Sequence, residues 1–265
     1  MDYITACAIV KDEGDYLLEW IVYHRLLGVT HFVLYDNGSQ VPVEQTVRLF
    51  AKHDDIEVVS FPGTGPPGRG RQNQAYMDCF SRVSGETVWL TLTDIDEFIV
   101  PIEDPDLVVL LQRFDKYGAL GVNWQTFGSS SHREKPTGLQ IENFRYRTPV
   151  QWEWNRHIKS IVRPERTKRA LSSHFCTYRD GWWCVNENEE PVIGPHNDPV
   201  STQQVQLNHY FTRSLAEYQL KVARGSGDGT AKREQSFRDV DAAAVEPDDA
   251  ILRFVPRVRT AISAA

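Results

Sequence analysis

The chain has 265 residues, of which 41% are hydrophobic, and a formal net charge of −7. A chain of this length and composition can bury a core large enough for one large domain, with or without appendages. The acidic balance excludes a protein that binds nucleic acid over its whole surface, because displacing counterions from phosphates requires a basic face. Basic residues gather locally, notably in the segment 156–169, so an anionic ligand would be held at one place.

The sequence carries no run of roughly 18 consecutive apolar residues, the length of a membrane span, and its first residues lack the pattern of a secretory signal. We therefore expect a cytoplasmic protein. The four cysteines form no CxxC pair, and we expect free thiols in a reducing compartment. A bond between Cys176 and Cys184 across a hairpin is the alternative.

The first hundred residues alternate between strand and helix patterns. Strand patterns occur at residues 3–10, 29–39, 56–61 and 88–92, and helical patterns at 15–27, 44–53 and 72–83. Gly28 stands where a left-handed residue ends a helix. Strand alternating with helix predicts an α/β fold with a mostly parallel, doubly wound sheet.

After residue 100 the patterns predict an irregular α+β half. Helical patterns occur at 106–117 and 214–224, and strand patterns at 118–126, 157–162 and 205–211. We expect one domain over residues 1–235, with a donor half at about 1–100 and an acceptor half at about 101–235. Residues 236–265 are expected to form a tail, either as an accessory helix or partly disordered.

Polar residues follow each of the first four predicted strands. Ligands of a doubly wound sheet collect at the carboxyl ends of its strands, so these residues are expected to meet at one edge. They are Lys11, Asp12 and Glu13; Asp36, Asn37 and Ser39; Arg69 and Arg71; and Asp94, Asp96 and Glu97.

The fourth strand ends in three carboxylates, Asp94, Asp96 and Glu97. Two aspartates separated by one residue point to the same face if the strand stays extended, and there they repel each other. A divalent cation removes this conflict, since Mg²⁺ or Mn²⁺ is commonly held by one or two carboxylates plus substrate phosphate oxygens. The alternative is an acidic trio that only ends the strand and caps the next element.

A second polar group follows the strand pattern at 205–211. His209 can serve as a neutral imidazole ligand to the same ion, while Lys221 and Arg224, three residues apart on a helical face, can face phosphates. The alternatives are a histidine of the core and a solvated helix face.

Six segments in this order resemble the glycosyltransferases of GT-A fold that form the family 2-like and family 92 group. They are AIVKDE, WIVYHRLLGVTHFVLYDNGS, DIDEFIVP, NWQTFGSSSH, KSIVRP and LNHYFTRSLAEYQLKVARG, and the match as a whole spans about residues 3–227. The resemblance implies a Rossmann-like sheet flanked by helices, a nucleotide-sugar donor, above all a uridine diphosphate (UDP) sugar, and a divalent cation, Mn²⁺ or Mg²⁺. It further implies transfer with inversion to a glycan, glycolipid or other hydroxyl acceptor, as in polysaccharide biosynthesis.

The resemblance also implies roles for single residues. Lys11, Glu13 and Asp36, with Asn37 beside them, would line the nucleoside pocket, and Arg71 and Gln72 would form its rim. Asp94, Asp96 and His209 would hold the metal and diphosphate, under a closing helix that carries Lys221 and Arg224. Trp124 and the loop 127–131, with Phe127, Ser129 and Ser130, would form the acceptor platform, because sugars offer apolar C–H faces ringed by hydroxyls. Core packing is the alternative for Trp124.

An inverting transfer also needs a base on the acceptor hydroxyl. Nine carboxylates lie between Trp124 and His209, and spacing alone selects none. We choose Glu142 because it follows the acceptor loop, beside apolar residues that would raise its pKa. A surface glutamate of a helix is the alternative. Catalysis would then rest on Glu142, Asp96, Lys221 and Arg224, with the cations and the metal stabilising the leaving diphosphate.

Two other functions stay open. The acidic pair could belong to a phosphoryl-transfer hydrolase, although such enzymes carry it on an early strand. Four tryptophans could instead form the face of a catalytically inert carbohydrate-binding protein: Trp152, Trp154, Trp182 and Trp183. The basic segment 156–169 could bring the protein to the inner face of a membrane. The sequence leaves the sugar, the acceptor and the oligomeric state open.

Overall fold

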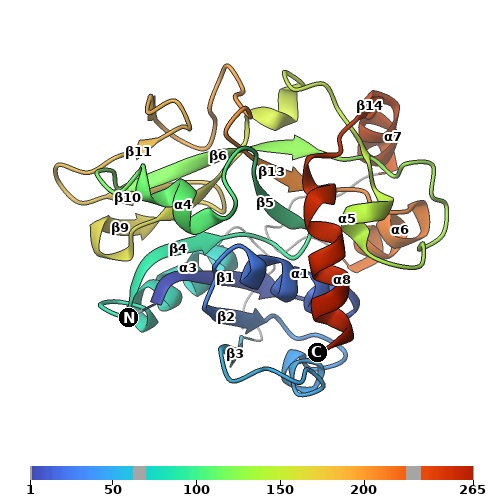
Figure 1. Cartoon of the computed structure of the whole chain (residues 1–265), viewed down its shortest axis with the longest axis horizontal. Helices are drawn as coiled ribbons and strands as arrows, with labels where there is room; N and C mark the ends of the chain where they lie inside the picture. Colours follow the sequence, from blue (N-terminus) through green and yellow to red (C-terminus); the bar gives the residue numbers. More distant parts are fainter. Residues whose placement is uncertain (1, 62–69, 225–233, 265) are drawn as a thin grey trace.

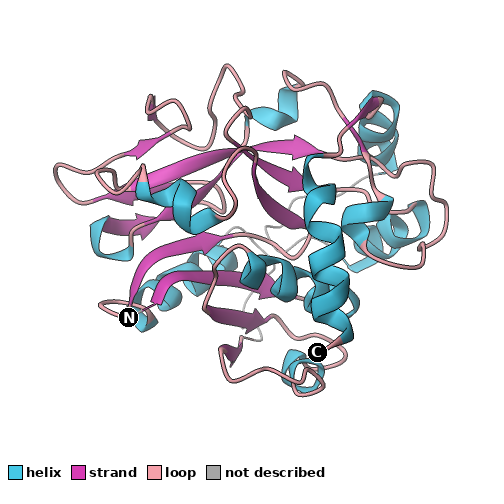
Figure 2. Ribbon diagram, in the orientation of Figure 1, coloured by secondary structure: helices cyan, strands magenta, loops and turns pink. Residues whose placement is uncertain are grey.

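The computed structural model describes residues 2–61, 70–224 and 234–264. Strands form a band through the middle of the molecule, and helices lie around it (Figure 2). Within these residues, ten strands join one sheet: β1 (Asp2–Val10), β2 (His31–Asp36), β3 (Ile56–Ser60), β4 (Thr87–Leu92), β5 (Glu97–Pro101), β6 (Ala119–Thr126), β8 (Ile158–Val162), β11 (Cys184–Val185), β12 (Pro191–Val192) and β13 (Val205–His209).

Two small sheets complete the strands. They pair β9 (Thr167–Ala170) with β10 (Cys176–Tyr178), and β7 (Tyr146–Arg147) with β14 (Glu246–Pro247). The α-helices are α1 (Gly14–Leu26), α2 (Val43–Val47), α3 (Gly70–Arg82), α4 (Leu107–Gln112), α5 (Gln140–Asn143), α6 (Leu215–Arg224), α7 (Glu234–Ala243) and α8 (Val255–Ser263). Short 3₁₀ turns are η1 (Glu153–Arg156), η2 (Pro164–Arg166) and η3 (Ala250–Phe254).

The order of the main sheet is β12-β11-β6-β8-β4-β1-β2-β3, with β13 paired to both β5 and β6. Strands β4, β1, β2 and β3 run parallel to one another, which confirms the α/β prediction for the first half. Strand β8 lies antiparallel between β4 and β6. The second half thus extends the same sheet, and Figure 1 shows β6 and β13 above the parallel strands.

Both faces of the parallel strands are buried, because helices pack on each. Alternate residues of β1 and β2, such as Ile4 and Phe32, belong to the core shared with α1 and α8. The intervening residues, such as Cys7 and Val33, pack against α3. This explains the continuous apolar runs, since a strand covered on both faces does not alternate. All four cysteines are free and buried, as predicted.

The carboxyl ends of the parallel strands meet at one edge. Val10 pairs with Asp36 and Cys7 pairs with Leu92, so the residues that follow β1, β2 and β4 leave the sheet side by side. Asn37 N donates to Val10 O, which ties the first two ends together. The predicted convergence of polar segments is therefore confirmed for those that follow β1, β2 and β4.

The C-terminal segment packs on the domain as part of its core. Phe254 and Val258 are buried in the cluster that holds α1, and α8 runs alongside α1 (Figure 1). Arg253 donates to the carbonyl oxygens of Pro101 and Ile102 at the end of β5. The predicted tail is thus an integrated pair of helices as far as residue 264. Among the described helices, none has the length and apolar character needed to cross a bilayer.

Candidate functional site

The acidic segment forms a tight turn between β4 and β5. Asp94 N donates to Glu97 Oε2 at 2.9 Å, and Glu97 N donates to Asp94 O at 3.0 Å. The extended conformation, which the sequence analysis assumed for both aspartates, therefore ends at Leu92. The turn directs Asp94 toward Lys159 and Asp96 toward Lys221. No shared face remains on which the two would repel each other.

Asp94 lies beside a buried lysine. Lys159 Nζ, on β8, is 2.9 Å from Asp94 Oδ2, and Gln72 Nε2, on α3, donates to Asp94 Oδ1 at 3.0 Å. Burial opposes a charge on Lys159, but Asp94 and Glu97 raise its pKa well above the usual value. Gln72, which the resemblance places at the rim of the nucleoside pocket, thus contacts Asp94, and Lys159 is a contact that the sequence did not reveal.

Glu97 is fully buried behind the two aspartates. Its Oε2 lies 3.3 Å from Lys159 Nζ, and its Oε1 accepts from Trp124 Nε1 at 2.9 Å. Burial raises the pKa of Glu97 to about 8, against the attraction of Lys159. Glu97 therefore joins the acidic turn to Trp124.

Asp96 meets Lys221 and His209. Lys221 Nζ, on α6, lies 2.5 Å from Asp96 Oδ2, and His209 Nε2, at the end of β13, lies 3.8 Å from the same oxygen. Burial would raise the pKa of Asp96, but Lys221 and His209 hold it well below the usual range. Burial also lowers the pKa of His209, so its imidazole is neutral at pH 7. His209 Nδ1 is buried and has no hydrogen-bond partner within the described residues.

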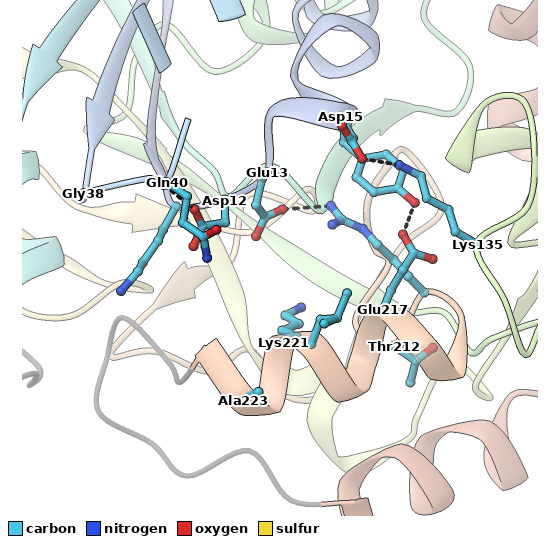
Figure 3. A pocket seen from close by; sticks show the side chains of 14 residues that line it. Asp12, Glu13, Asp15, Gly38, Gln40, Lys135, Thr212, Glu217, Lys221 and Ala223 are labelled. Atoms are coloured by element: carbon cyan, nitrogen blue, oxygen red, sulfur yellow. Dashed lines mark hydrogen bonds and ion pairs between the residues drawn. The ribbon is translucent and has the colours of Figure 1, made fainter. Parts of the chain in front are cut away.

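A pocket of about 790 Å³ opens beside this group (Figure 3). Asp12 and Glu13, after β1, face Lys221 and Ala223 on α6 across it. The lining consists of Lys11, Asp12, Glu13, Asp15, Tyr16, Gly38, Gln40, Lys135, Thr212, Arg213, Glu217, Leu220, Lys221 and Ala223. Lys11, Glu13 and Lys221, which the sequence placed around the donor, thus share one cavity.

Arg213 is a buried cation of the pocket to which the sequence assigned no role. Its Nη2 donates to Glu13 Oε2 at 3.0 Å, and its guanidinium lies 3.9 Å from the centre of the Tyr16 ring. Its φ of +50° is in the left-handed region, which is uncommon for a residue other than glycine and often marks a functional site. The only signal in the sequence is its place four residues after His209.

The other donor residues lie around β2 and α3. Asp36 accepts from Ser39 N at 2.8 Å and from Val43 N at 3.0 Å, so its carboxylate holds the turn and the start of α2. Asn37 Oδ1 lies 3.4 Å from Arg71 Nη1. Arg224 ends α6, and its side chain lies outside the described structure, as does the whole of Arg69.

Trp124, on β6, lies among three imidazoles next to the acidic turn. Its ring centroid is 4.3 Å from that of His209 and 5.0 Å from those of His157 and His174. A chain of rings continues from His209 to Phe211 and on to Trp154. Trp124 is only partly buried, so it contributes both to packing and to this surface.

The loop after Trp124 is fixed by the C-terminal half. Phe127 is fully buried, and Ser129 N donates to Asp241 Oδ1 at 2.8 Å. Ser130 Oγ accepts from the backbone N of Arg145 at 2.8 Å. Phe127, Ser129 and Ser130 thus hold the loop in shape through contacts within the protein.

Glu142 lies at the start of α5. Its Oε1 accepts from Leu139 N at 2.9 Å, and its Oε2 accepts from Arg259 Nη2 at 2.7 Å. A glutamate at this position that accepts from the N-cap backbone N–H supplies one half of a capping box, since Leu139 has no side-chain acceptor for the other half. The structure therefore gives Glu142 a capping role, and no described contact joins it to Asp94, Asp96 or Trp124.

The four tryptophans of the alternative binding face fall into two pairs. Trp152 contacts Trp154 near Phe211, while Trp183 contacts Tyr117 and Trp182 lies under Arg166. No described contact links the two pairs, so they do not form one continuous aromatic face.

Nowhere in the described part of the chain do three His, Cys, Asp or Glu side chains group as a complete metal site. Of the three predicted ligands, Asp96 and His209 come together, and Asp94 is held by Lys159 and Gln72. A carboxylate and an imidazole still fit a cation that takes its remaining ligands from substrate phosphates and water, as Mg²⁺ commonly does.

The family model for glycosyltransferase family 92 matches residues 4–246. A family 92 protein of Ricinus communis is 25% identical over 266 residues, covering 95% of this chain and 43% of its own length. One of Oryza sativa subsp. japonica is 25% identical over 264 residues, covering 95% of this chain and 42% of its own. The chain thus spans less than half the length of these curated relatives.

Solved structures resemble the chain more distantly. S. aureus TarS 1-349 in complex with UDP-GlcNAc matches 76% of this chain and 62% of its own, with 11% identity and a TM-score of 0.40. Glucosyl-3-phosphoglycerate synthase from Mycobacterium tuberculosis matches 63% and 58%, with 13% identity and a TM-score of 0.36. The family model, by contrast, covers nearly the whole sequence, and the chain therefore belongs to glycosyltransferase family 92.

Proposed function

We propose that the chain transfers a sugar from a nucleotide diphosphate donor, in the first place a UDP-sugar, to a hydroxyl of a saccharide, with inversion at the anomeric carbon. The observation that carries the proposal is the meeting of Asp96, His209 and Lys221 beside a cavity large enough for a nucleotide sugar. Family membership supports the reaction class.

The cations of the pocket suit the diphosphate. Lys11, Arg213 and Lys221 line it, and negative charge grows on the diphosphate as the glycosidic bond breaks. Cations that line the site stabilise such charge as it develops. Arg213 is held by Glu13 and Tyr16, so little conformational freedom is lost when it meets the ligand.

Asp96 and His209 are the residues that would hold a divalent cation, Mn²⁺ or Mg²⁺. Such an ion would act as a Lewis acid on the diphosphate oxygens. Lys159 and Gln72 hold Asp94 next to the position proposed for this ion. In the proposal, Asp94 positions the turn and faces the donor with its exposed portion, since 36% of its side chain is accessible.

The chain of rings around Trp124 suits an uncharged saccharide acceptor. Aromatic rings stack on the C–H faces of sugars, and the partly buried Trp154 and Phe211 continue the ring surface that begins at His209. His157 Nδ1 lies 2.9 Å from Trp154 O and His174 Nδ1 lies 2.9 Å from Ile158 O. Each Nδ1 must donate to its carbonyl, which leaves Nε2 as an acceptor for sugar hydroxyls.

The base is not assigned to Glu142, because Arg259 and the backbone of α5 hold its carboxylate. Contact with a membrane through the segment 156–169 also remains a proposal. Arg163 within it pairs with Asp115, and Lys159 points into the acidic turn, which leaves less free positive charge than the sequence suggests.

Calorimetry of UDP binding, with and without Mn²⁺, tests the donor. We expect UDP to bind, and to bind more tightly with Mn²⁺. Nuclear magnetic resonance of the product with a panel of UDP-sugars and oligosaccharides would then give the anomeric configuration. Absence of UDP binding under both conditions would refute the proposed function, and retention of configuration would refute the inverting course.

A further inference from the structure

Lys221 already supplies a cation to Asp96. Its ammonium lies 2.5 Å from Asp96 Oδ2 and donates to Phe211 O at 3.1 Å. Both side chains are more than nine-tenths buried, with 9% of Lys221 and 7% of Asp96 exposed. His209 Nε2 lies 3.8 Å from the same oxygen. The ammonium thus adjoins the position where the proposed function needs a divalent ion.

We infer that Lys221 and a divalent cation compete for Asp96, and that the donor diphosphate resolves the competition by drawing Lys221 away. The inference rests on the proposed function. It assigns to Lys221, beyond its contact with the leaving group, the coupling of metal binding to diphosphate binding.

Distance brings the two cations into competition at Asp96 Oδ2. An Mg²⁺ ion bound by Asp96 Oδ2 at about 2.1 Å would lie no more than about 4.6 Å from Lys221 Nζ in its present position. Two cations this close repel strongly where water is largely excluded. Asp96 alone cannot neutralise the three positive charges of Lys221 and a divalent ion.

A diphosphate offers Lys221 another partner. Lys221 lines the pocket, and its stem of four methylene groups can turn the ammonium from Asp96 toward a ligand there. Oδ2 is then free for the metal, whose charge the diphosphate also neutralises. Each ligand therefore raises the affinity for the other, and the two enhancement factors must be equal.

Mn²⁺ alone is the probe, with free Mn²⁺ counted by electron paramagnetic resonance. Lys221→Met keeps much of the side-chain volume and removes the charge, so it should bind Mn²⁺ at least about tenfold more tightly than the wild type when no nucleotide is present. The factor by which UDP enhances Mn²⁺ binding should fall by a similar amount. Asp96→Asn added to Lys221→Met should abolish the gained affinity.

Two variants serve as controls. Lys135→Met removes a lysine that lines the same pocket but pairs with Asp15 at 2.7 Å, and it should leave Mn²⁺ affinity unchanged. Lys221→Arg keeps the charge and should keep the weak affinity of the wild type. Circular dichroism of each variant verifies the fold.

Equal or weaker Mn²⁺ binding by folded Lys221→Met, or none, would overturn the inference. If UDP still binds the wild type in calorimetry, the proposed function survives that result. If the wild type binds no UDP with or without Mn²⁺, the proposed function fails, and the inference fails with it.

Discussion

Lys159 is the residue whose removal should disturb the acidic turn most. It is 2% exposed, and its ammonium contacts both Asp94 and Glu97. Lys159→Met keeps an unbranched side chain of similar length and removes the charge, which leaves the fully buried Glu97 without its cation. Removing one partner of a buried ion pair typically costs about 3–5 kcal/mol, because the other charge stays uncompensated.

The magnitude can be bounded from the contacts. At 2.9 and 3.3 Å, the two attractions are each about 5–6 kcal/mol at an effective dielectric constant near 20, and desolvation of the lysine offsets several kcal/mol of their sum. We therefore expect a loss of about 4 kcal/mol in the free energy of unfolding. For a chain of this length that corresponds to a fall of roughly 8 °C in Tm.

Urea unfolding of a double-mutant cycle at pH 9, where Glu97 with its pKa of about 8 is ionised, isolates this interaction. Glu97→Gln keeps a hydrogen-bond acceptor for Trp124 and removes the buried charge, so the double variant with Lys159→Met should be more stable than Lys159→Met alone. A coupling energy of about 2 kcal/mol or more is expected. Additive effects of the two changes, or a loss below about 1 kcal/mol for Lys159→Met, would refute the assignment of Lys159 as the counter-charge of the turn.

Three further changes test other parts of the structure. Burial raises the pKa of Glu19 from 4.5 to about 7, so its stabilising contribution is present below pH 4.5 and about 3 kcal/mol of it is lost as the pH rises through 7. Glu19→Gln should flatten this part of the stability profile measured by urea unfolding, and an unchanged profile would contradict the assignment. Arg213→Lys keeps the charge but loses the planar fork, and calorimetry should show UDP binding about tenfold weaker; unchanged affinity would place Arg213 away from the donor. Gly28→Ala forces a Cβ to within 2.5 Å of Val108 Cγ2 at a φ of +97°, and thermal unfolding should show a loss of at least about 1 kcal/mol, whereas wild-type stability would refute the strain.

The elements found from the sequence are those whose signal is local. The parallel strands and α1 carry their apolar patterns and end signals within ten or fifteen residues, and Gly28 lies where the helix was expected to end. A local pattern also indicates the acidic segment, because a buried strand is followed directly by carboxylates. The convergence of strand ends then follows from parallel topology.

The contacts missed depend on pairing between distant segments. Lys159 reaches Asp94 because β8 inserts between β4 and β6, 65 residues after the turn, and no local pattern shows that insertion. The turn itself was missed because DID can continue a strand, whereas the antiparallel pairing of β5 with β13 requires the chain to reverse there. Glu142 was chosen by its neighbours in the sequence, while its partner Arg259 lies 117 residues away.

Release of UDP from nucleotide sugars tests the central claim most directly. With Mn²⁺ and a panel of UDP-sugars and oligosaccharides, the wild type should release UDP from at least one donor, and Asp96→Ala should reduce that release to background. Asp96→Ala that folds and still releases UDP at the wild-type rate would contradict the role given to the acidic turn. A wild type that releases UDP from none of the donors would contradict the proposed transfer itself.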